Sequence, residues 1–530
     1  MATDPLGRTA IEPAATLATP PALSLRAYLA TSGATPIVIA VVILGMFLPA
    51  VLVTYAFADD YSFLWMAVSG EPSTQFGRSI LYRWAIDGRP VGGLLLGSFL
   101  SAAGTIEALQ FMRLFAVATT VALALLMHWT LVRSRFGRTL AALIAIFVCS
   151  MPAFQLYAAW TTLFHAPLGM LLAGGASVLA TAASDAPSRL RTVRVIGATT
   201  MLLAALMIYQ PTAMFFWVVL AIAIVGERND PQRALRTTVT HLVAGGVALA
   251  LAFLSARVTF WYLNDAATAG KRSELTTDIV GKAWWFIEQP FYQSLNLFDL
   301  TPSTWLAAVI TSIAAGGMLL WLVRRSPRPL LYIGIALLLI PLSFLPNLVI
   351  AENVLVFRTQ VALTSLMALY VCIGALGLWL TARDWLEPRL RIGALRAADR
   401  VALAIAVVFV AGSAATAANN VTNLIVMPQT TELRMIRSQV AALPVAVARV
   451  GFVATPYQAT MAKFTVAEEF GLPTTSLRFA LQPLVRLLLH ERGSLPPWAP
   501  RPIVDTLPWD TTTYPVGVPV IDVRGIQRFR

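Results

Sequence analysis

The chain has 530 residues, of which 58% are hydrophobic and only 12% are charged, and its formal net charge is +13. Soluble domains carry about twice that share of charge, and the mean hydropathy is +0.72. The composition therefore excludes an ordinary soluble enzyme and indicates an integral membrane protein. The positive charge does not indicate nucleic-acid binding here, because basic residues mark the cytoplasmic loops of membrane proteins.

The apolar runs lack the alternation of membrane-barrel strands, so we expect helical spans of about 20 residues. The first run has no short hydrophobic core followed by a small-residue cleavage site, and we expect it to remain as an anchored helix. Cys149 and Cys372 both lie inside apolar runs and predict neither a disulfide framework nor a metal site.

The pattern of apolar runs predicts eleven spans. They cover residues 36–58, 111–132, 139–157, 160–182, 193–209, 211–226, 239–263, 303–323, 329–350, 359–381 and 400–418. Arginines follow every even-numbered span, as at Arg133, Arg135 and Arg138 after the second. Since such loops are cytoplasmic, residues 1–35 are expected inside and residues 419–530 outside.

The stretch PVGGLLLGSFLSAAG, residues 90–104, decides this topology. It is apolar but short for a span, and counting it as one would place the arginines at 133–138 outside. We therefore interpret 62–104 as helices lying at the membrane surface. They are expected to form part of one outer loop, residues 59–110.

The tail after residue 418 is more polar and rich in proline. Within it, residues 447–455 (VARVGFVAT) and 517–525 (GVPVIDVRG) predict strands. Residues 458–472 predict a helix that ends at Gly471. The fold class is thus an all-α polytopic membrane domain, residues 36–418, followed by a small extracytoplasmic α/β domain.

The stretch FADDYSF, residues 57–63, places two carboxylates, Asp59 and Asp60, where the first span is expected to end. A solvated pair that merely ends a helix is one interpretation. In the other, repulsion between adjacent like charges raises the pKa of one carboxyl group, which suits a proton acceptor near neutral pH. Tyr61, Phe63 and Trp65 follow and are able to wall off a partly dry site.

Arginines on the outer side oppose the positive-inside trend, so each needs a reason. They are Arg78, Arg83, Arg89, Arg113 and Arg358. A guanidinium group suits a phosphate, which it binds through two parallel hydrogen bonds. The alternative for each is a salt bridge to a nearby carboxylate: Asp87, Glu107 or Glu352.

Three other polar residues lie near the expected outer face. His165 is close to the outer end of the fourth span, where a lone histidine is more often a packing residue than a ligand. Tyr209 and Gln210 precede Pro211 and are expected to shape a helix break.

Carboxylates beside guanidinium groups over an apolar wall suit sugar transfer from a polyprenyl-phosphate sugar. There, a carboxylate deprotonates a hydroxyl and the cations stabilise the departing phosphate.

The chain resembles the GT-C type membrane glycosyltransferases, and among them the GtrII glucosyltransferase family. The resemblance covers about residues 36–420. It rests on ADDYSF, DGRPVGGLLLGSFL, RLFAVATTVALALLMHWTLVRSRFG, MIYQPTAMFF and ENVLVFRTQ, in that order. It implies inverting transfer from an undecaprenyl-phosphate sugar to a glycan acceptor at the bacterial inner membrane.

The resemblance also implies residue roles. The base is an acidic residue of the first outer loop, here Asp59 in preference to Asp60, while Arg89 and Arg358 meet the donor phosphate. A pair of carboxylates is compatible with Mg²⁺ or Mn²⁺ but does not by itself choose between a metal and none. Two alternatives stay open: a flippase of lipid-linked sugars and a surface-polysaccharide polymerase or ligase. The sugar, the acceptor and the oligomeric state also stay open.

Overall fold

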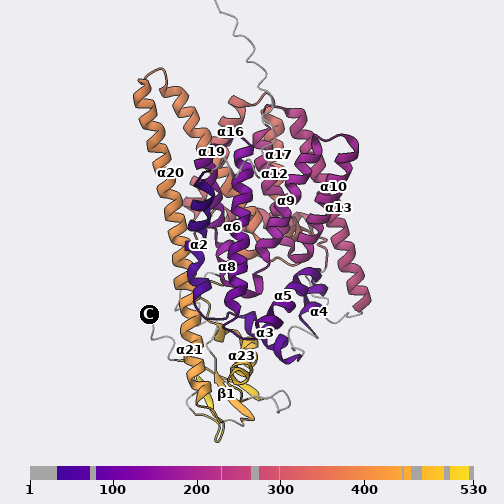
Figure 1. The fold of residues 1–530 in the computed structure, drawn as a ribbon, viewed down its shortest axis with the longest axis vertical. Coiled ribbons are helices and arrows are strands. Elements are labelled where there is room, and N and C mark those ends of the chain that lie inside the picture. Colours follow the sequence, from indigo (N-terminus) through magenta and orange to yellow (C-terminus); the bar gives the residue numbers. More distant parts are fainter. Residues whose placement is uncertain are drawn as a thin grey trace, which may run out of the picture.

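A computed structural model describes residues 33–71, 79–227, 229–263, 274–297, 299–301, 303–444, 447–454, 468–494, 502–511 and 513–524. Within these residues, a bundle of roughly parallel and antiparallel helices ends in a small sheet domain at one side (Figure 1). Most of the described chain is helical, as the composition predicts.

Eight helical segments of the described chain are long and apolar enough to cross a membrane, and they match eight of the eleven expected spans. They are α2 (Thr35–Leu52), α6 (Leu109–Arg133), η1 with α9 (Thr161–Leu163 and Ala166–Ser184), α10 (Ser188–Ile208), α13 (Pro231–Leu263), α16 (Thr304–Arg325), α19 (Val361–Leu386) and α20 (Ile392–Asn420), which continues through η5 (Val421–Val426) into α21 (Met427–Ala441).

The other three expected spans are interrupted or short. α7 (Arg138–Cys149) and α8 (Pro152–Ala159) meet at a bend of 65° before Pro152 and make one broken span. α11 (Gln210–Ala213) with α12 (Phe215–Gly226), and α17 (Pro329–Leu342) with α18 (Leu345–Val349), are shorter. α12 is buried on almost every face. A fully buried helix is apolar all round, like a transmembrane helix, so its sequence predicts a span although the helix is short.

The first span ends earlier than expected. α2 stops at Leu52, and residues 53–57 have no regular structure before α3 (Asp59–Ser69) begins. The aspartate pair therefore starts a new helix rather than ending the first span. α4 (Ile80–Ile86) and α5 (Pro90–Ala103) follow. The 14 residues of α5 are too few to cross a membrane, as the topology requires.

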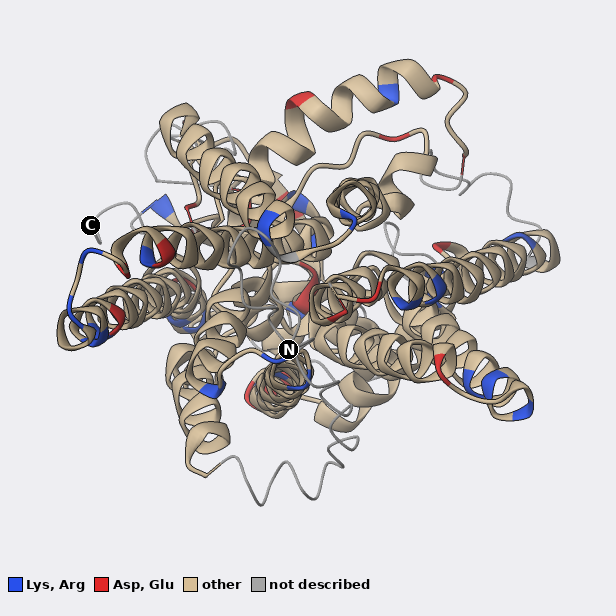
Figure 2. Cartoon of the chain, turned by 90° about the horizontal axis from the view of Figure 1, so that it is seen from above, with Lys and Arg blue, Asp and Glu red and all other residues tan. Residues whose placement is uncertain are grey.

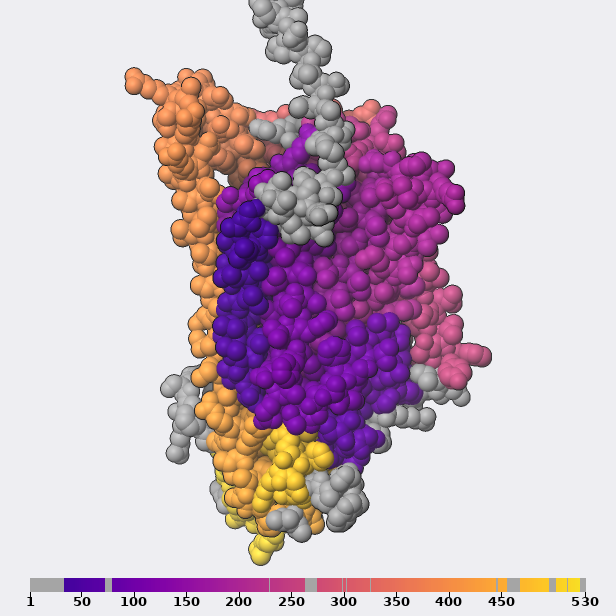
Figure 3. All heavy atoms as spheres, in the orientation of Figure 1, coloured from indigo at the N-terminus to yellow at the C-terminus, as the bar shows by residue number. Residues whose placement is uncertain are grey.

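The C-terminal domain lies at the same end as α3, α4 and α5, and its residues cover that end of the bundle (Figures 1 and 3). It contains β1 (Arg449–Val453), η6 (Thr474–Ser476), α23 (Arg478–Glu491), β2 (Ile503–Leu507) and β3 (Val520–Asp522). The three strands are parallel, in the order β2-β1-β3, with Phe452 opposite Thr506 and Ile521.

Two of these strands, β1 and β3, confirm expected strands. The expected helix 458–472 lies mostly outside the described residues. Its last part, 468–472, forms a turn in which Gly471 has φ +77°. α23 and β2 were not expected from the sequence. A smaller segment with α14 (Ile279–Phe286), η3 (Ile287–Phe291), α15 (Tyr292–Ser294) and the 3-10 turn η4 (Phe357–Thr359) completes this end.

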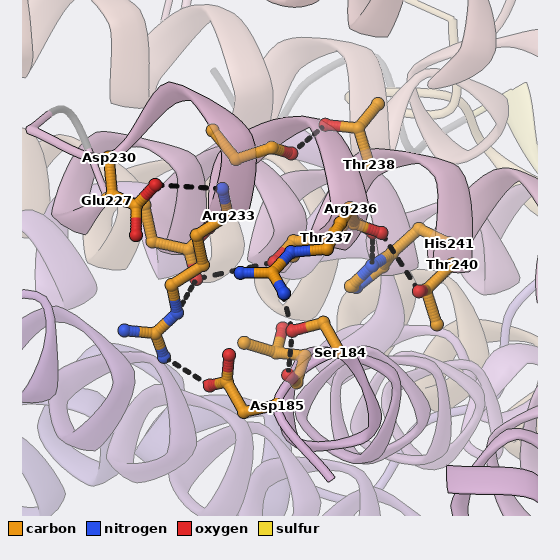
Figure 4. Close-up of polar contacts among 12 residues, drawn as sticks. Ser184, Asp185, Glu227, Asp230, Arg233, Arg236, Thr237, Thr238, Thr240 and His241 are labelled. Atoms are coloured by element: carbon orange, nitrogen blue, oxygen red, sulfur yellow. Dashed lines mark hydrogen bonds and ion pairs between the residues drawn. The ribbon is translucent and has the colours of Figure 1, made fainter. Parts of the chain in front are cut away.

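The opposite end of the bundle carries the arginine-rich turns, such as the one joining α19 to α20. Viewed from that end, the helices are mostly uncharged, and Lys and Arg lie mainly on loops and helix ends (Figure 2). A polar cluster, of which Glu227 is buried and Asp185 is exposed, lies there as well. Arg233 joins Glu227, at 3.3 Å, to Asp185, at 2.6 Å (Figure 4).

Candidate functional site

The site is built around a helix break between α8 and α9. Trp160 is extended, one 3-10 turn follows at Thr161–Leu163, and α9 begins only after His165, where Pro167 suits its first turn. All residues of the break are buried, yet three nitrogens, Trp160 Nε1 and both ring nitrogens of His165, have no hydrogen-bond partner among the described residues. Since buried polar atoms are nearly always paired, this break offers donors to a bound molecule.

The two aspartates have different surroundings. Asp60 is buried, with its Oδ1 accepting from the backbone N–H and the hydroxyl of Thr162, each at 2.7 Å, and its Oδ2 accepting from Phe57 N at 3.0 Å. Asp59 is only partly buried. Asp60 thus fastens the start of α3 to the helix break, while the neighbouring side chain remains nearer to the solvent.

Burial raises the pKa of Asp60, against the hydrogen bonds from Thr162 and Phe57 and the positive charge of Arg113. One member of the pair therefore has the raised pKa that the sequence predicts. The main cause is desolvation rather than repulsion between the two carboxylates.

Arg113, expected as a possible phosphate ligand, is instead fully buried and committed to the backbone. Its guanidinium donates to the carbonyl oxygens of Ala50, Val53 and Tyr55 and to Thr161 Oγ1, at 2.6 to 3.2 Å. These bonds satisfy carbonyl groups at the end of α2 and in the extended segment that follows. Arg113 thereby stabilises the early end of the first span and the extended segment that leads to Asp59 and Asp60 beside the helix break.

Arg89, Tyr209 and Gln210 come together as a unit. Arg89 lies immediately before α5 and donates from Nε to Gln210 Oε1 at 2.6 Å, and its guanidinium lies 4.6 Å from the centre of the Tyr209 ring. Gln210 in turn donates to the carbonyl oxygens of Asp87, at 3.0 Å, and Gly88, at 3.2 Å. The expected break at Tyr209 is present, since α10 ends at Ile208 and α11 begins at Gln210.

His165 lies beside this unit. Its ring packs edge-on against Trp84, with ring centres 4.9 Å apart, and Trp84 also lies 5.9 Å from the Arg89 guanidinium. The charge of Arg89 acts on His165 electrostatically. His165 is therefore fully buried and packed against Trp84, and it lies near Arg89, a candidate phosphate ligand.

Arg358 approaches the break from the turn η4. Its guanidinium lies 5.0 Å from the Trp160 ring centre and forms an ion pair with Glu469, a residue of the C-terminal domain. The Tyr157 hydroxyl donates to the Arg358 carbonyl oxygen at 2.5 Å. Arg358 thus lies beside Trp160 at the start of the break, while Arg89 lies near His165 at its end, across the Trp84 ring.

One of the expected alternative salt bridges is present, since Asp87 lies 3.9 Å from Arg83. Glu107 instead lies 2.6 Å from Arg437 of the C-terminal part. Arg78 lies outside the described residues.

Sequence reasoning missed several residues of the site. Glu468 accepts from Phe357 N and, at 3.0 Å, from Gln293, which itself accepts from Gln360 at 2.6 Å. Burial raises the pKa of Glu468. The adjacent carboxylates Glu468 and Glu469 in AEEFGL could have drawn attention to this segment. Nothing in the local sequence, however, shows that the segment packs against η4. Tyr157, Trp160 and Thr162 were missed as well, although the narrow gap between the third and fourth expected spans marked their position.

The aspartate pair is the place where the sequence expects a divalent cation. Within the described part of the chain, no group of three or more His, Cys, Asp or Glu side chains is placed to hold a metal ion. Asp60 Oδ1 already accepts two hydrogen bonds and Oδ2 accepts one. Mg²⁺ is commonly held by one or two carboxylates together with waters and substrate phosphates, so Mg²⁺ or Mn²⁺ at the aspartate pair stays a prediction.

No protein-family model matches the chain, and no curated protein sequence matches it. Among solved structures, the archaeal oligosaccharyltransferase AglB from Archaeoglobus fulgidus, in complex with an inhibitory peptide and a dolichol-phosphate, is similar with a TM-score of 0.44 and 11% identity. The match covers 86% of this chain and 65% of AglB, so the chain spans less than two thirds of that protein.

A second similar structure is ArnT from Cupriavidus metallidurans bound to undecaprenyl phosphate. Its TM-score is 0.38 at 15% identity, over 91% of this chain and 90% of ArnT. Both TM-scores are below 0.5, so both likenesses are distant. Membership of the GtrII family stays a prediction.

Proposed function

We propose that the chain is a membrane glycosyltransferase of the GT-C type. It would move a sugar from a polyprenyl-phosphate sugar to a hydroxyl of a surface glycan or a lipid-linked acceptor. The observation that carries this proposal is the convergence at the helix break. Arg358 lies beside Trp160, Arg89 lies near His165 across the Trp84 ring, and Asp59 begins the adjoining helix, while the Trp160 and His165 ring nitrogens are buried without a partner among the described residues.

Asp59 is the base in this proposal. It is the first residue of α3 and is only partly buried, so an acceptor hydroxyl can reach its carboxylate. Asp60 is a positioning residue, because its carboxylate oxygens are engaged by Thr162 and Phe57. The assignment agrees with the resemblance, which also favours the first acidic residue of the pair.

Arg89 and Arg358 bind the donor phosphate. Both guanidinium groups lie over aromatic rings, which lower the local dielectric and strengthen a bond to an anion. Gln210 holds Arg89 in place through a hydrogen bond, and Glu469 holds Arg358 through an ion pair. The Arg358 guanidinium has several N–H donors, so it can bind a phosphate while it keeps its contact with Glu469. Trp160 Nε1 and His165 supply further donors to the phosphate or to sugar hydroxyls.

The reaction balances with these residues alone. The acceptor oxygen attacks the anomeric carbon from the face opposite the phosphate and loses its proton to Asp59. The bond between the anomeric carbon and the phosphate oxygen breaks, and its electron pair leaves with the polyprenyl phosphate. The guanidinium groups stabilise the developing charge, and attack from the opposite face inverts the anomeric centre.

The proposal places the chain in the inner or plasma membrane of a bacterium. Residues 1–35 and the arginine-rich turns would lie inside, and the site and the C-terminal domain outside. Helices α3, α4 and α5, next to which Asp59 and Arg89 lie in the chain, are at one end of the bundle (Figure 1). This favours transfer over transport, since a transporter gathers its substrate contacts near the bilayer midplane.

The test is deletion of the gene followed by mass spectrometry of the surface glycans and lipid-linked glycans. We expect one sugar substituent to disappear and to return when the native gene is supplied on a plasmid. In membranes from the deletion strain, the purified protein should then release polyprenyl phosphate from the donor. Glycans that keep their full mass after deletion would contradict the proposal.

A further inference from the structure

Ala58, the residue directly before Asp59, has a strained backbone. Its φ is +49° and its ψ is −111°, a conformation that is unfavourable for a residue other than glycine and persists only when the surroundings impose it. The direction in which α3 starts, and with it the direction of the Asp59 side chain, therefore depends on what holds the Ala58 peptide.

The contact that holds it comes from the other end of the chain. The Ala58 N–H donates to Thr474 Oγ1 at 3.0 Å, across 416 positions of sequence. The Thr474 hydroxyl donates its own proton to Gln429 Oε1 at 2.8 Å, and Gln429 Nε2 donates to the Leu472 carbonyl oxygen at 2.7 Å. Ala58, Thr474 and Gln429 are all buried, so solvent does not compete for these bonds.

A buried carboxylate fixes the turn that carries Thr474. Glu432 accepts from Thr474 N at 2.9 Å and from Thr475 N at 2.8 Å. Gln429 and Glu432 are three residues apart on α21 and so share one face of that helix. Since α21 continues α20, a helix that crosses the membrane anchors the chain of hydrogen bonds that ends at Ala58.

Apolar packing joins the same parts. Phe63 and Leu64 of α3 belong to one hydrophobic cluster with Leu484 and Leu488 of α23. This cluster docks the C-terminal domain on α3, and the hydrogen bond from Ala58 to Thr474 lies at the start of the docked helix. The domain is therefore in direct contact with the helix that carries the base.

We propose that the C-terminal domain aims the catalytic base, with Thr474 as the positioning residue. Its hydroxyl keeps Ala58 in the strained conformation that points Asp59 toward the acceptor. This rests on the proposed function, because it assumes that Asp59 accepts the proton. Loss of the hydroxyl lets the Ala58 peptide relax and turns Asp59 away while leaving Arg89, Arg358 and the helix break in place.

The test compares Thr474→Val with Thr474→Ser, in the deletion strain and as purified protein. Valine keeps the shape of threonine without the hydroxyl, and serine keeps the hydroxyl. We expect Thr474→Val to slow sugar addition by about 10-fold or more, because a small misplacement of a catalytic group has large effects. Binding of undecaprenyl phosphate, the probe for the donor site, should change by less than about 2-fold, and Thr474→Ser should recover most of the rate.

Ser476→Ala is the matched control. Its hydroxyl lies in the same turn but donates to the Pro473 carbonyl oxygen, so its loss should leave the rate near native. A Thr474→Val rate equal to native would overturn the proposal, as would a loss of rate and of undecaprenyl phosphate binding together that serine does not restore. Asp59→Asn in the same assay separates the two claims. If it is inactive while Thr474→Val is native, the positioning role fails and the proposed function stands.

Discussion

Adjacent residues of one helix have separate roles here. Successive side chains on a helix point about 100° apart, so Asp60 turns into the protein and binds Thr162 while Asp59 stays partly accessible. From the sequence, only the family resemblance prefers Asp59 to Asp60. No local pattern divides the pair, since the bond between Asp60 and Thr162 joins residues 102 positions apart.

Asp60→Asn should destabilise the protein more than Asp59→Asn does. An amide offers one acceptor oxygen and places an NH₂ group against a donor, so Thr162 or Phe57 loses its partner. A buried polar group left unpaired costs about 1–3 kcal/mol. Thermal unfolding in detergent checks this, with Asp59→Asn as the control. Equal unfolding temperatures for the two variants would show that the three bonds to Asp60 contribute nothing measurable.

Arg89→Ala should weaken binding of undecaprenyl phosphate by about 10-fold or more, because a charge-assisted bond in apolar surroundings is lost. Arg89→Lys should recover only part of the affinity, since a point charge replaces a planar fork that also contacts Gln210. Arg83→Ala is the control, as Arg83 pairs with Asp87 on the same short segment. If Arg89→Ala binds undecaprenyl phosphate as tightly as Arg83→Ala does, Arg89 does not bind the donor phosphate.

At the scale of elements, hydropathy locates helices well and their ends poorly. Each of the eleven expected segments contains helix, because a segment buried in a bundle and one facing lipid are both apolar. For the same reason the sequence does not separate the buried α12 from a true span. The early end of α2 depends on Arg113, whose bonds to Ala50 and Tyr55 no local pattern reveals.

The turn after α12 should make stability depend on pH. Burial raises the pKa of Glu227 from its ordinary value of 4.5 to about 7, against the opposing charge of Arg233. Because the folded-state pKa exceeds the unfolded-state pKa, the contribution of Glu227 to stability is fully present below pH 4.5 and is lost as the pH rises through about 7.

Glu227→Gln does not titrate at this position. The unfolding temperature of the native protein relative to this variant should therefore fall between pH 4.5 and about pH 7 and then level off. Unfolding curves in detergent over this range give the comparison. A difference that stays constant with pH would mean that Glu227 is ionised throughout.

For the whole molecule, the sequence predicts the two-part architecture and which segments share an end, but not how the two parts connect. The ion pair from Arg358 to Glu469 and the hydrogen bond from Ala58 to Thr474 both join the membrane domain to the C-terminal domain. The polar tail therefore supplies part of the candidate site, which composition alone did not suggest. The strand β2 was missed because IVDTL lies among prolines that favour an irregular tail.

The arginine pattern predicts which end faces the cytoplasm. With the native cysteines replaced by alanine, a cysteine at Thr105 should react with an impermeant reagent from outside the cell. A cysteine at Thr139 should react only after the membrane is opened. Both positions are exposed and lie at opposite ends of the bundle. Labelling of Thr105→Cys from the cytoplasmic side only would invert the topology.

The central claim is that Asp59 removes the proton from the acceptor, and sugar transfer by Asp59→Asn measures it most directly. Asparagine keeps the shape of the side chain but accepts no proton. The variant should insert, unfold at a temperature near that of the native protein and bind undecaprenyl phosphate with native affinity. It should nevertheless transfer sugar more slowly by a factor on the order of 10² or more. Transfer at the native rate by a correctly folded Asp59→Asn would contradict the account.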